Sequence, residues 1–353
     1  MGELRGNTAF ITGATGLVGS HLAEQLAAQG ARLRCLVRLT SDTALLRQLG
    51  AELVQGDVTD QPEKLRELMA GCDLVFHCAA MVDDWAPRAA MMRVNVEGVR
   101  NMLEAAASLA AASGRAGSKS GPTLRRFLMV GSMVVYGMGP QNNLDESAPF
   151  VHTGDNYNYT KILAAELAFR YARERGLPVV LCAPPYIYGP RDRQFFPRIF
   201  ETLRDGRFKF IGDGNRPITL AYALNVVRAL ILAAQAEKLH PGEHLLITDG
   251  ESITRRELVE MICREMGYRL PRACVPIWVA KAALPAVETW AKLRRKPPIL
   301  NRFKMKFMTT PLTFDISKAR TALGYEPVEP PRESLRKTIR WFREHHPEMA
   351  PAG

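Results

Sequence analysis

The chain has 353 residues, of which 47% are hydrophobic and 24% charged, an ordinary composition for a globular protein of one large domain or two closely joined lobes. Its 47 Lys and Arg residues exceed its 36 Asp and Glu residues, and the net charge of +11 favours anionic partners such as nucleotide phosphates. The scattered placement of the basic residues argues against dedicated nucleic-acid binding, and the six cysteines form no CxxC pair, so we expect no metal site.

The first part of the chain alternates between short β-rich runs and helical patterns. Strand patterns cover residues 8–13, 32–38, 51–57 and 72–80, and helical patterns cover residues 17–30, 43–50 and 61–71. Such alternation builds βαβ units around a parallel sheet. Because these crossovers are right-handed, we expect a doubly wound α/β (Rossmann) fold whose ligands bind beyond the carboxyl ends of the strands.

Three glycines separate the first strand from the first helix. Gly13, Gly16 and Gly19 have the spacing G-x-x-G-x-x-G, which lets backbone approach a pyrophosphate at the N-terminus of a helix. A strand-to-helix turn that only needs room is the alternative. In this βαβ context we predict a dinucleotide site, and it also takes in the neighbouring Thr15, Leu17 and Val18.

The ends of the second and third strands indicate which dinucleotide binds. An acidic residue at the end of the second strand would bind the ribose 2′-OH of NAD, whereas an arginine accommodates a 2′-phosphate. Arg38 occupies this end, so we favour NADP(H) and leave NAD(H) open, since Arg38 could instead stack on adenine. Asp57 and Val58 follow the third strand, where Asp57 could meet the adenine amino group or merely close a turn.

The pattern then continues through a long helix at about residues 88–112. A Gly/Ser-rich insert over 113–123 predicts a surface loop. Strand patterns over 125–132 and 177–185 flank a helical pattern over 159–176.

Regular alternation ends after residue 185, where Pro and Gly become more frequent. We expect a Rossmann domain over residues 1–185 with a returning segment near 216–236. Residues 186–353 are expected to form mainly a smaller C-terminal lobe that binds the substrate.

The motif "YNYTK" places Tyr157 and Lys161 four residues apart, on one face of a helix. A free tyrosine is a poor base at neutral pH, and a nearby ammonium group would pull its pKa toward the working range. A Tyr-x-x-x-Lys pattern alone is common on solvated helix faces. Here Ser132 also ends the preceding strand, within reach of a substrate oxygen, which favours a catalytic set.

These motifs, in this order, resemble the extended subgroup of the short-chain dehydrogenase/reductase family, within the epimerase/dehydratase superfamily. Further matches are "DLVFHCAA" (73–80), "VNVEGVRNMLEAA" (94–106), "PPYIYGPRD" (184–192) and "FDISKARTALGYEP" (314–327). The resemblance spans about residues 6–342. It implies an NAD(P)-dependent oxidoreductase that interconverts a secondary alcohol and a ketone. One departure is Gly131, where many members have Ser or Thr.

By this resemblance Tyr157 is the catalytic acid/base, Lys161 its activator and ribose ligand, and Ser132 the residue that orients the substrate oxygen. Asn95 matches an asparagine of a proton relay, with helix packing as the alternative. The resemblance also places further residues against the cofactor: Ala79 and Ala80 at a ribose, and Pro184 and Ile187 at the nicotinamide.

The substrate class is argued from the C-terminal half. Sugar-nucleotide enzymes of the superfamily have an arginine that clamps the substrate diphosphate, and Ile218 stands at that place, with Arg216 two residues earlier. The stretches 222–234 and 275–307 instead resemble 3β-hydroxysteroid dehydrogenases. We expect a hydrophobic substrate, either a 3β-hydroxysteroid or sterol, C4-carboxylated forms included, or a β-keto or β-hydroxy acyl compound. A nucleotide-sugar epimerase or dehydratase that retains its cofactor is the alternative.

Residues 275–307 combine bulky apolar residues with a basic cluster. The apolar residues Ile277, Trp278, Leu284 and Trp290 recur at near-helical spacing. They would either cover the core of the lobe or wall an apolar pocket and rest on a membrane surface. In the loop over 81–88, Trp85 would contact a substrate ring or pack.

The remaining expectations concern the cell and the assembly. The N-terminus has no signal pattern and no apolar run is long enough to span a bilayer, so we expect a cytoplasmic protein, peripheral to a membrane if 275–307 binds one. The small and apolar residues of 162–172 suit a homodimer interface.

Overall fold

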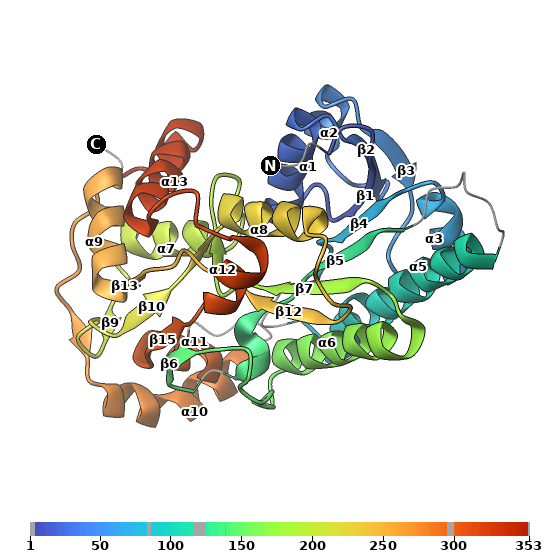
Figure 1. Ribbon diagram of the computed structural model, residues 1–353. Helices are drawn as coiled ribbons and strands as arrows, with labels where there is room; N and C mark the ends of the chain where they lie inside the picture. Colours follow the sequence, from blue (N-terminus) through green and yellow to red (C-terminus); the bar gives the residue numbers. More distant parts are fainter. Residues whose placement is uncertain (1–3, 83–85, 116–123, 138, 295–299, 352–353) are drawn as a thin grey trace.

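The computed structural model describes residues 4–82, 86–115, 124–137, 139–294 and 300–351. Its central element is a sheet of seven parallel strands in the order β12-β7-β5-β4-β1-β2-β3 (Figure 1). The strands are β1 (Thr8–Thr12), β2 (Arg32–Val37), β3 (Glu52–Gln55), β4 (Leu74–His77), β5 (Arg126–Val130), β7 (Val179–Ala183) and β12 (Glu243–Leu246). The chain order reverses between β1 and β4, which confirms the predicted doubly wound sheet.

Helices cover both faces of this sheet (Figure 1). One face packs against α1 (Leu17–Ala28) and α8 (Ala223–Gln235), which lie side by side, and α2 (Ala44–Gln48) adjoins α1. The other face packs against α3 (Pro62–Met69), α5 (Gly98–Arg115) and α6 (Asn156–Arg175). The expected helix over 88–112 begins as α4 (Arg88–Met92) and passes through a π-helical turn, Arg93–Glu97, before α5. Most of the insert over 113–123 lies outside the described residues.

The buried core follows the strand periodicity on each side of the sheet. On β1, Ala9 and Ile11 face the α1 and α8 side, whereas Phe10 faces the α3, α5 and α6 side. All three are fully buried, because successive side chains of a strand point to opposite faces and this sheet is covered on both.

The remaining elements form a smaller lobe at one end of the molecule (Figure 1). Its four-stranded sheet has the order β13-β10-β15-β6, and two two-stranded sheets pair β8 with β11 and β9 with β14. The strands are β6 (Gln141–Leu144), β8 (Ile187–Tyr188), β9 (Phe210–Ile211), β10 (Pro217–Thr219), β11 (Ala221–Tyr222), β13 (Ser252–Thr254), β14 (Cys274–Val275) and β15 (Leu312–Phe314). The helices are α7 (Phe195–Arg204), α9 (Arg255–Met266), α10 (Ile277–Arg294), α11 (Arg302–Thr309), α12 (Ser317–Leu323) and α13 (Pro331–His345).

Two strands belong to a different part of the fold from the one that the expected boundary at residue 185 gives them. β6 lies before it but pairs with β15 in the lobe, and β12 lies beyond the expected returning segment 216–236 but forms the edge of the main sheet. Of that segment, α8 packs on the main sheet whereas β10 belongs to the lobe. The domain boundaries stay a proposal.

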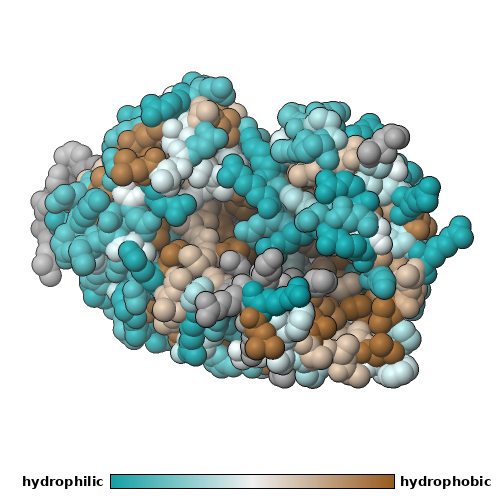
Figure 2. Space-filling view, turned by 180° about the vertical axis from the view of Figure 1, so that it is seen from behind, coloured by the Kyte–Doolittle hydropathy of each residue, from teal (hydrophilic) through white to brown (hydrophobic). Residues whose placement is uncertain are grey.

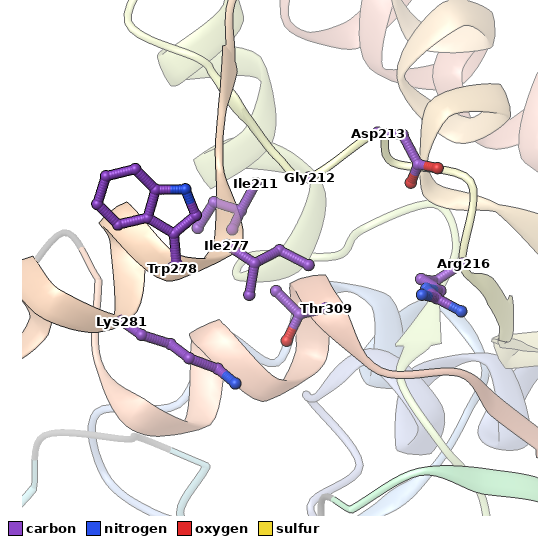
Figure 3. Close-up of a pocket in the computed structure, with 8 residues that line it drawn as sticks. All are labelled: Ile211, Gly212, Asp213, Arg216, Ile277, Trp278, Lys281 and Thr309. Atoms are coloured by element: carbon purple, nitrogen blue, oxygen red, sulfur yellow. The ribbon is translucent and has the colours of Figure 1, made fainter.

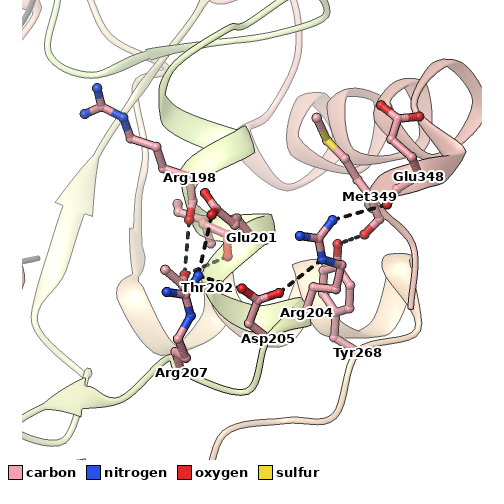
Figure 4. A network of polar contacts seen from close by, with 10 residues as sticks. Arg198, Glu201, Thr202, Arg204, Asp205, Arg207, Tyr268, Glu348 and Met349 are labelled. Atoms are coloured by element: carbon pink, nitrogen blue, oxygen red, sulfur yellow. Dashed lines mark hydrogen bonds and ion pairs between the residues drawn. The ribbon is translucent and has the colours of Figure 1, made fainter. Parts of the chain in front are cut away.

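Polar contacts tie the C-terminal segment to α7 and to Tyr268, which follows α9 (Figure 4). The Arg204 guanidinium donates to the Glu348 carbonyl at 3.3 Å, and the Tyr268 hydroxyl donates to the Met349 carbonyl. Among the described residues, no helix is long and apolar enough to cross a membrane.

Candidate active site

The carboxyl ends of β1 and β4 meet where the strand order reverses, the place where such sheets bind ligands. Gly13 follows β1 with a φ of +68°, and a Cβ there would lie 2.7 Å from the Ala79 nitrogen that follows β4. Any other residue would therefore push the two strand ends apart. Ala79 is half-buried, and Ala80 beside it is exposed.

The turn after β1 leaves the N-terminus of α1 open. Gly16 is exposed and precedes the first helical residue, and its N–H donates to the Gly13 carbonyl at 2.9 Å. No side chain of the described residues caps α1, and its first turn has no acidic residue. A Cβ on Gly19 would collide with the Gly13 carbonyl, so the helix can pack this closely only with glycine. The result is a backbone cradle that fits a pyrophosphate, with Thr15 and Leu17 half-buried beside it and Val18 buried beneath.

Arg38 and Asp57 lie at the ends of the adjacent strands β2 and β3. Arg38 is exposed, and its guanidinium has no hydrogen bond or ion pair with any described residue. One oxygen of Asp57 accepts from the Thr59 N–H at 2.9 Å and the Thr59 hydroxyl at 2.8 Å, which is the turn role left open above. Val58 is buried against the backbone of Gly98. The free guanidinium of Arg38 suits a phosphate.

Ser132, Tyr157 and Lys161 come together at the end of β5. The Ser132 side chain lies near enough to the Tyr157 hydroxyl to lower the Tyr157 pKa, and Ser132 accepts from the Val134 N–H at 3.3 Å. The Lys161 ammonium lies 6.0 Å from the centre of the Tyr157 ring and donates to the Val130 carbonyl at 3.2 Å. Asp155 caps α6 by accepting from the Asn158 N–H at 2.7 Å, so the helix begins where it aligns Tyr157 with Lys161.

Burial controls the titration of both groups. It raises the pKa of Tyr157 to about 12, with a smaller rise from Asp155 and an opposing effect of the nearby Ser132 side chain. Burial also lowers the pKa of Lys161 to about 8. The expected lowering of the Tyr157 pKa by Lys161 is not found in this arrangement, because the pKa of Lys161, about 8, lies below that of Tyr157, so the amine is already neutral in the pH range where Tyr157 titrates. Tyr157 therefore carries its proton at neutral pH and is ready to donate it.

Asn158 is a buried polar residue beside the site that the sequence analysis missed. It is fully buried, and its side-chain N–H groups donate to the Val134 carbonyl at 2.7 Å and the Val151 carbonyl at 3.0 Å. Its side-chain oxygen accepts from the Thr153 N–H at 3.0 Å. Asn158 thus holds the turn after Ser132 against the start of α6. Its position inside "YNYTK", between the two residues singled out, was the available signal.

Asn95 lies in the π-helical turn and is buried. Its side chain accepts from the Met81 N–H at 2.8 Å and donates to the Met81 carbonyl at 3.0 Å and to the Thr160 hydroxyl at 3.3 Å. Thr160 in turn donates to the Tyr157 carbonyl at 3.0 Å. These contacts tie the segment after β4 to α6, as in the packing alternative, and a direct catalytic role for Asn95 stays a prediction.

A second pair missed from the sequence lies beneath the cradle. The Thr12 hydroxyl and His77 Nδ1 are 3.0 Å apart, and the Ala79 N–H donates to the Thr12 hydroxyl at 3.2 Å. Burial and the charge of Lys161 lower the pKa of His77 to about 3, so this imidazole is neutral. The pair joins β1 to β4 at the point where the strand order reverses.

The other predicted residues lie on the lobe side of the edge. The Pro184 carbonyl accepts from the Met133 N–H at 3.1 Å, and Ile187 pairs with Ala221 between β8 and β11. Ile218 is buried on β10 between Ile253 and Leu312. Trp85 lies outside the described residues.

Comparison with known proteins gives one family and several relatives. The profile of the NAD dependent epimerase/dehydratase family matches residues 9–248. A ketoreductase of Stigmatella aurantiaca, named for 4-hydroxy-2-methyl-3-oxo-4-farnesyl-3,4-dihydroquinoline-1-oxide, is 30% identical over 90% of this chain and 91% of its own. A 2-alkyl-3-oxoalkanoate reductase of Shewanella oneidensis is 28% identical over 93% and 84%. A 3-beta-hydroxysteroid dehydrogenase of Mycolicibacterium neoaurum is 27% identical over 98% and 93%.

Solved structures share the fold. The crystal structure of gox2253 has a TM-score of 0.76 and 28% identity, over 96% of this chain and 99% of that one. The UDP-glucuronic acid 4-epimerase of Bacillus cereus, solved with NAD, has a TM-score of 0.74 and 19% identity over the same shares, a likeness of fold alone.

Proposed function

The chain belongs to the NAD dependent epimerase/dehydratase family as an NAD(P)-dependent enzyme of the extended short-chain type, and we propose that it interconverts a secondary alcohol and a ketone on a hydrophobic substrate. The observation that carries the proposal is the meeting of Ser132, Tyr157 and Lys161 beside an open, glycine-lined helix terminus. Such a set has no purpose in a protein that only senses a nucleotide.

Separate residues of the chain would bind the cofactor, transfer the proton and orient the substrate. The glycine turn and the N–H groups of α1 would hold the pyrophosphate of the cofactor, which accepts or supplies the hydride when bound. In ketone reduction the Tyr157 hydroxyl donates its proton to the substrate oxygen, and in alcohol oxidation the same oxygen takes the proton back. Ser132 would orient that substrate oxygen, and Lys161 would hold the ribose of the cofactor. The raised pKa of Tyr157 suits reduction at neutral pH.

We place the substrate among apolar ketones and alcohols, either sterol-like or β-keto acyl. Three relatives match nearly the whole chain at 27–30% identity. Their names are a 3-beta-hydroxysteroid dehydrogenase, a 2-alkyl-3-oxoalkanoate reductase and a ketoreductase named for a farnesyl-bearing dihydroquinoline oxide. A nucleotide sugar is less well supported, because Ile218, at the place of the diphosphate clamp, is an apolar side chain packed inside the lobe sheet and offers no cation to a diphosphate.

Nicotinamide absorbance during turnover tests the proposal. The enzyme is offered NADH and NADPH with 3-ketosteroids, β-keto acids and their esters, and the oxidised cofactors with the matching alcohols. We expect cofactor oxidation with at least one ketone class, and none with the Tyr157→Phe variant. Interconversion of a UDP-sugar without net cofactor turnover would overturn the proposal in favour of an epimerase.

The cofactor phosphate and the assembly are further proposals. The exposed guanidinium of Arg38, which pairs with none of the described residues, supports NADP(H) over NAD(H). For a homodimer through 162–172 the support is weak, since Ile162, Leu167 and Ala168 are buried within the chain, whereas Glu166 and Arg170 are exposed.

A further inference from the structure

The outward face of α10 is apolar although it is exposed. Trp278 is 73% exposed, Trp290 57% and Leu293 74%, among the most exposed large apolar side chains of the described residues. Ala282, Pro285 and Ala286 are exposed too, and these positions recur at helical spacing. The inward face is also apolar, since Ala280 and Ala291 are buried, Ala280 in a cluster with Ile211 and Met305. A surface helix with only its own core to cover would be polar on its outer side.

Basic side chains border this apolar face. Lys281 and Arg294 are exposed on α10, and the Arg294 guanidinium lies 4.3 Å from the centre of the Trp290 ring. Lys306 is exposed on α11, which packs against α10. The sequence of α10 contains a single acidic residue, the half-buried Glu288. Apolar and aromatic side chains edged by cations, on a chain of net charge +11, complement an anionic lipid surface.

A cavity of about 560 Å³ lies beside the same helix. Figure 3 shows Trp278, Ile277 and Lys281 of α10 together with Ile211 on one side of it, and Asp213 and Arg216 on the other. Thr309 also lines it, so the wall combines apolar side chains with charges of both signs. Figure 2 shows apolar side chains gathered low on the molecule, on the side where α10 lies.

We propose that α10 docks the protein onto an anionic lipid bilayer, lying in the plane of the interface. Trp278, Trp290 and Leu293 enter the boundary between headgroups and acyl chains, and Lys281 and Arg294 meet the lipid phosphates. The contact is peripheral, because no described helix can cross a membrane. It requires nothing of the proposed reaction, although it would bring the lobe to the place where apolar substrates dissolve.

Vesicle co-sedimentation of the full chain tests the docking surface. The vesicles are phosphatidylcholine alone or phosphatidylcholine mixed with phosphatidylglycerol. We expect binding to the mixed vesicles, weaker binding to phosphatidylcholine alone, and a loss of binding as salt rises. Trp278→Ala with Trp290→Ala should weaken binding by at least about tenfold, because both side chains leave the interface. Lys281→Glu should weaken binding to the mixed vesicles only. Val328→Ala, which truncates an exposed apolar side chain on another part of the lobe, is the matched control.

Three outcomes overturn the proposal. They are no binding to anionic vesicles, equal binding by the double tryptophan variant, and a dimer of the parent chain that the double variant loses, which would mean that a second copy covers α10. The turnover of a soluble ketone by Leu293→Ala, a variant on the docking face that does not line the cavity, separates this proposal from the proposed function. Loss of docking leaves that turnover unchanged, and a failure of the reaction leaves vesicle binding unchanged.

Discussion

The carboxyl ends of the strands in the main sheet and the outer face of α10 differ in which kinds of side chain are buried and which are exposed. At the sheet edge, polar side chains such as Asn95, Asn158 and Thr160 are buried, and their hydrogen bonds are met within the chain. On α10, Trp278 and Leu293 are large and apolar, yet they are exposed. Buried, paired polar groups fix a geometry for chemistry, whereas exposed apolar groups indicate that something outside the chain covers them.

Removal of the Tyr157 hydroxyl should have the largest effect on turnover. Tyr157→Phe keeps the ring but removes the proton donor, so turnover should fall by about a thousandfold or more, at the upper end of what general acid catalysis contributes. Cofactor affinity, measured by fluorescence titration, should change by no more than about twofold, because the ring stays in place. Turnover close to that of the parent enzyme would remove Tyr157 from the reaction.

Substitution of Lys161 measures how much its buried charge lowers the free energy of unfolding. Its pKa is lowered from 10.5 to about 8, so below pH 8 the folded protein carries a buried charge that destabilises it. Between about pH 8 and 10.5 the unfolded chain binds the proton that the folded protein has released, so this group makes the free energy of unfolding rise with pH. Lys161→Met should therefore be more stable than the parent at pH 7, by up to about 3 kcal/mol, with the difference shrinking toward pH 10.

Denaturant unfolding at pH 7 to 10 measures this difference. Lys281→Met, which removes an exposed ammonium group from α10, is the control. A Lys161→Met difference that stays constant across this range would contradict a lowered pKa for Lys161.

Asn158 tests whether the buried amide positions the site. Asn158→Ala leaves the Val134 and Val151 carbonyls without their donor, which should lower the free energy of unfolding by about 2 kcal/mol or more. Because the turn after Ser132 is then loosened, kcat should fall in the folded variant while cofactor affinity is kept. Asn156→Ala, a half-buried amide two residues earlier, is the matched control. A loss of stability with kcat unchanged would make Asn158 purely structural.

Substitution of Arg38 should change the preference of the enzyme between NADPH and NADH. Arg38→Asp replaces a guanidinium that suits a 2′-phosphate with a carboxylate that suits a 2′-OH, so the ratio of kcat/KM for NADPH to that for NADH should fall at least about tenfold. Arg66→Asp makes the same charge change on the exposed side of α3 and should leave the ratio unchanged. Unchanged NADPH affinity in Arg38→Asp would refute the phosphate site.

Local patterns predicted the sheet edge well and the lobe poorly. The glycine turn and the four-residue spacing of Tyr157 and Lys161 are fixed within one turn and one helix, so the sequence indicates them directly. The pairing of β6 with β15 brings together Asn143 and Thr313, which are 170 residues apart in the sequence. No local sequence pattern predicts this pairing. The sequence of α10 is apolar on more than one side, and periodicity alone does not tell which side meets the core.

The smallest expected effect is on the stability of α10. Truncation of a buried aromatic side chain such as Phe76 should cost about 3–5 kcal/mol, because it leaves a cavity. Trp278→Ala removes a larger side chain, yet it should change the free energy of unfolding by no more than about 0.5 kcal/mol, since 73% of Trp278 is already in water. Denaturant unfolding without lipid measures both. A large loss in Trp278→Ala would mean that Trp278 serves the lobe's own core, and the contrast between the two regions would disappear.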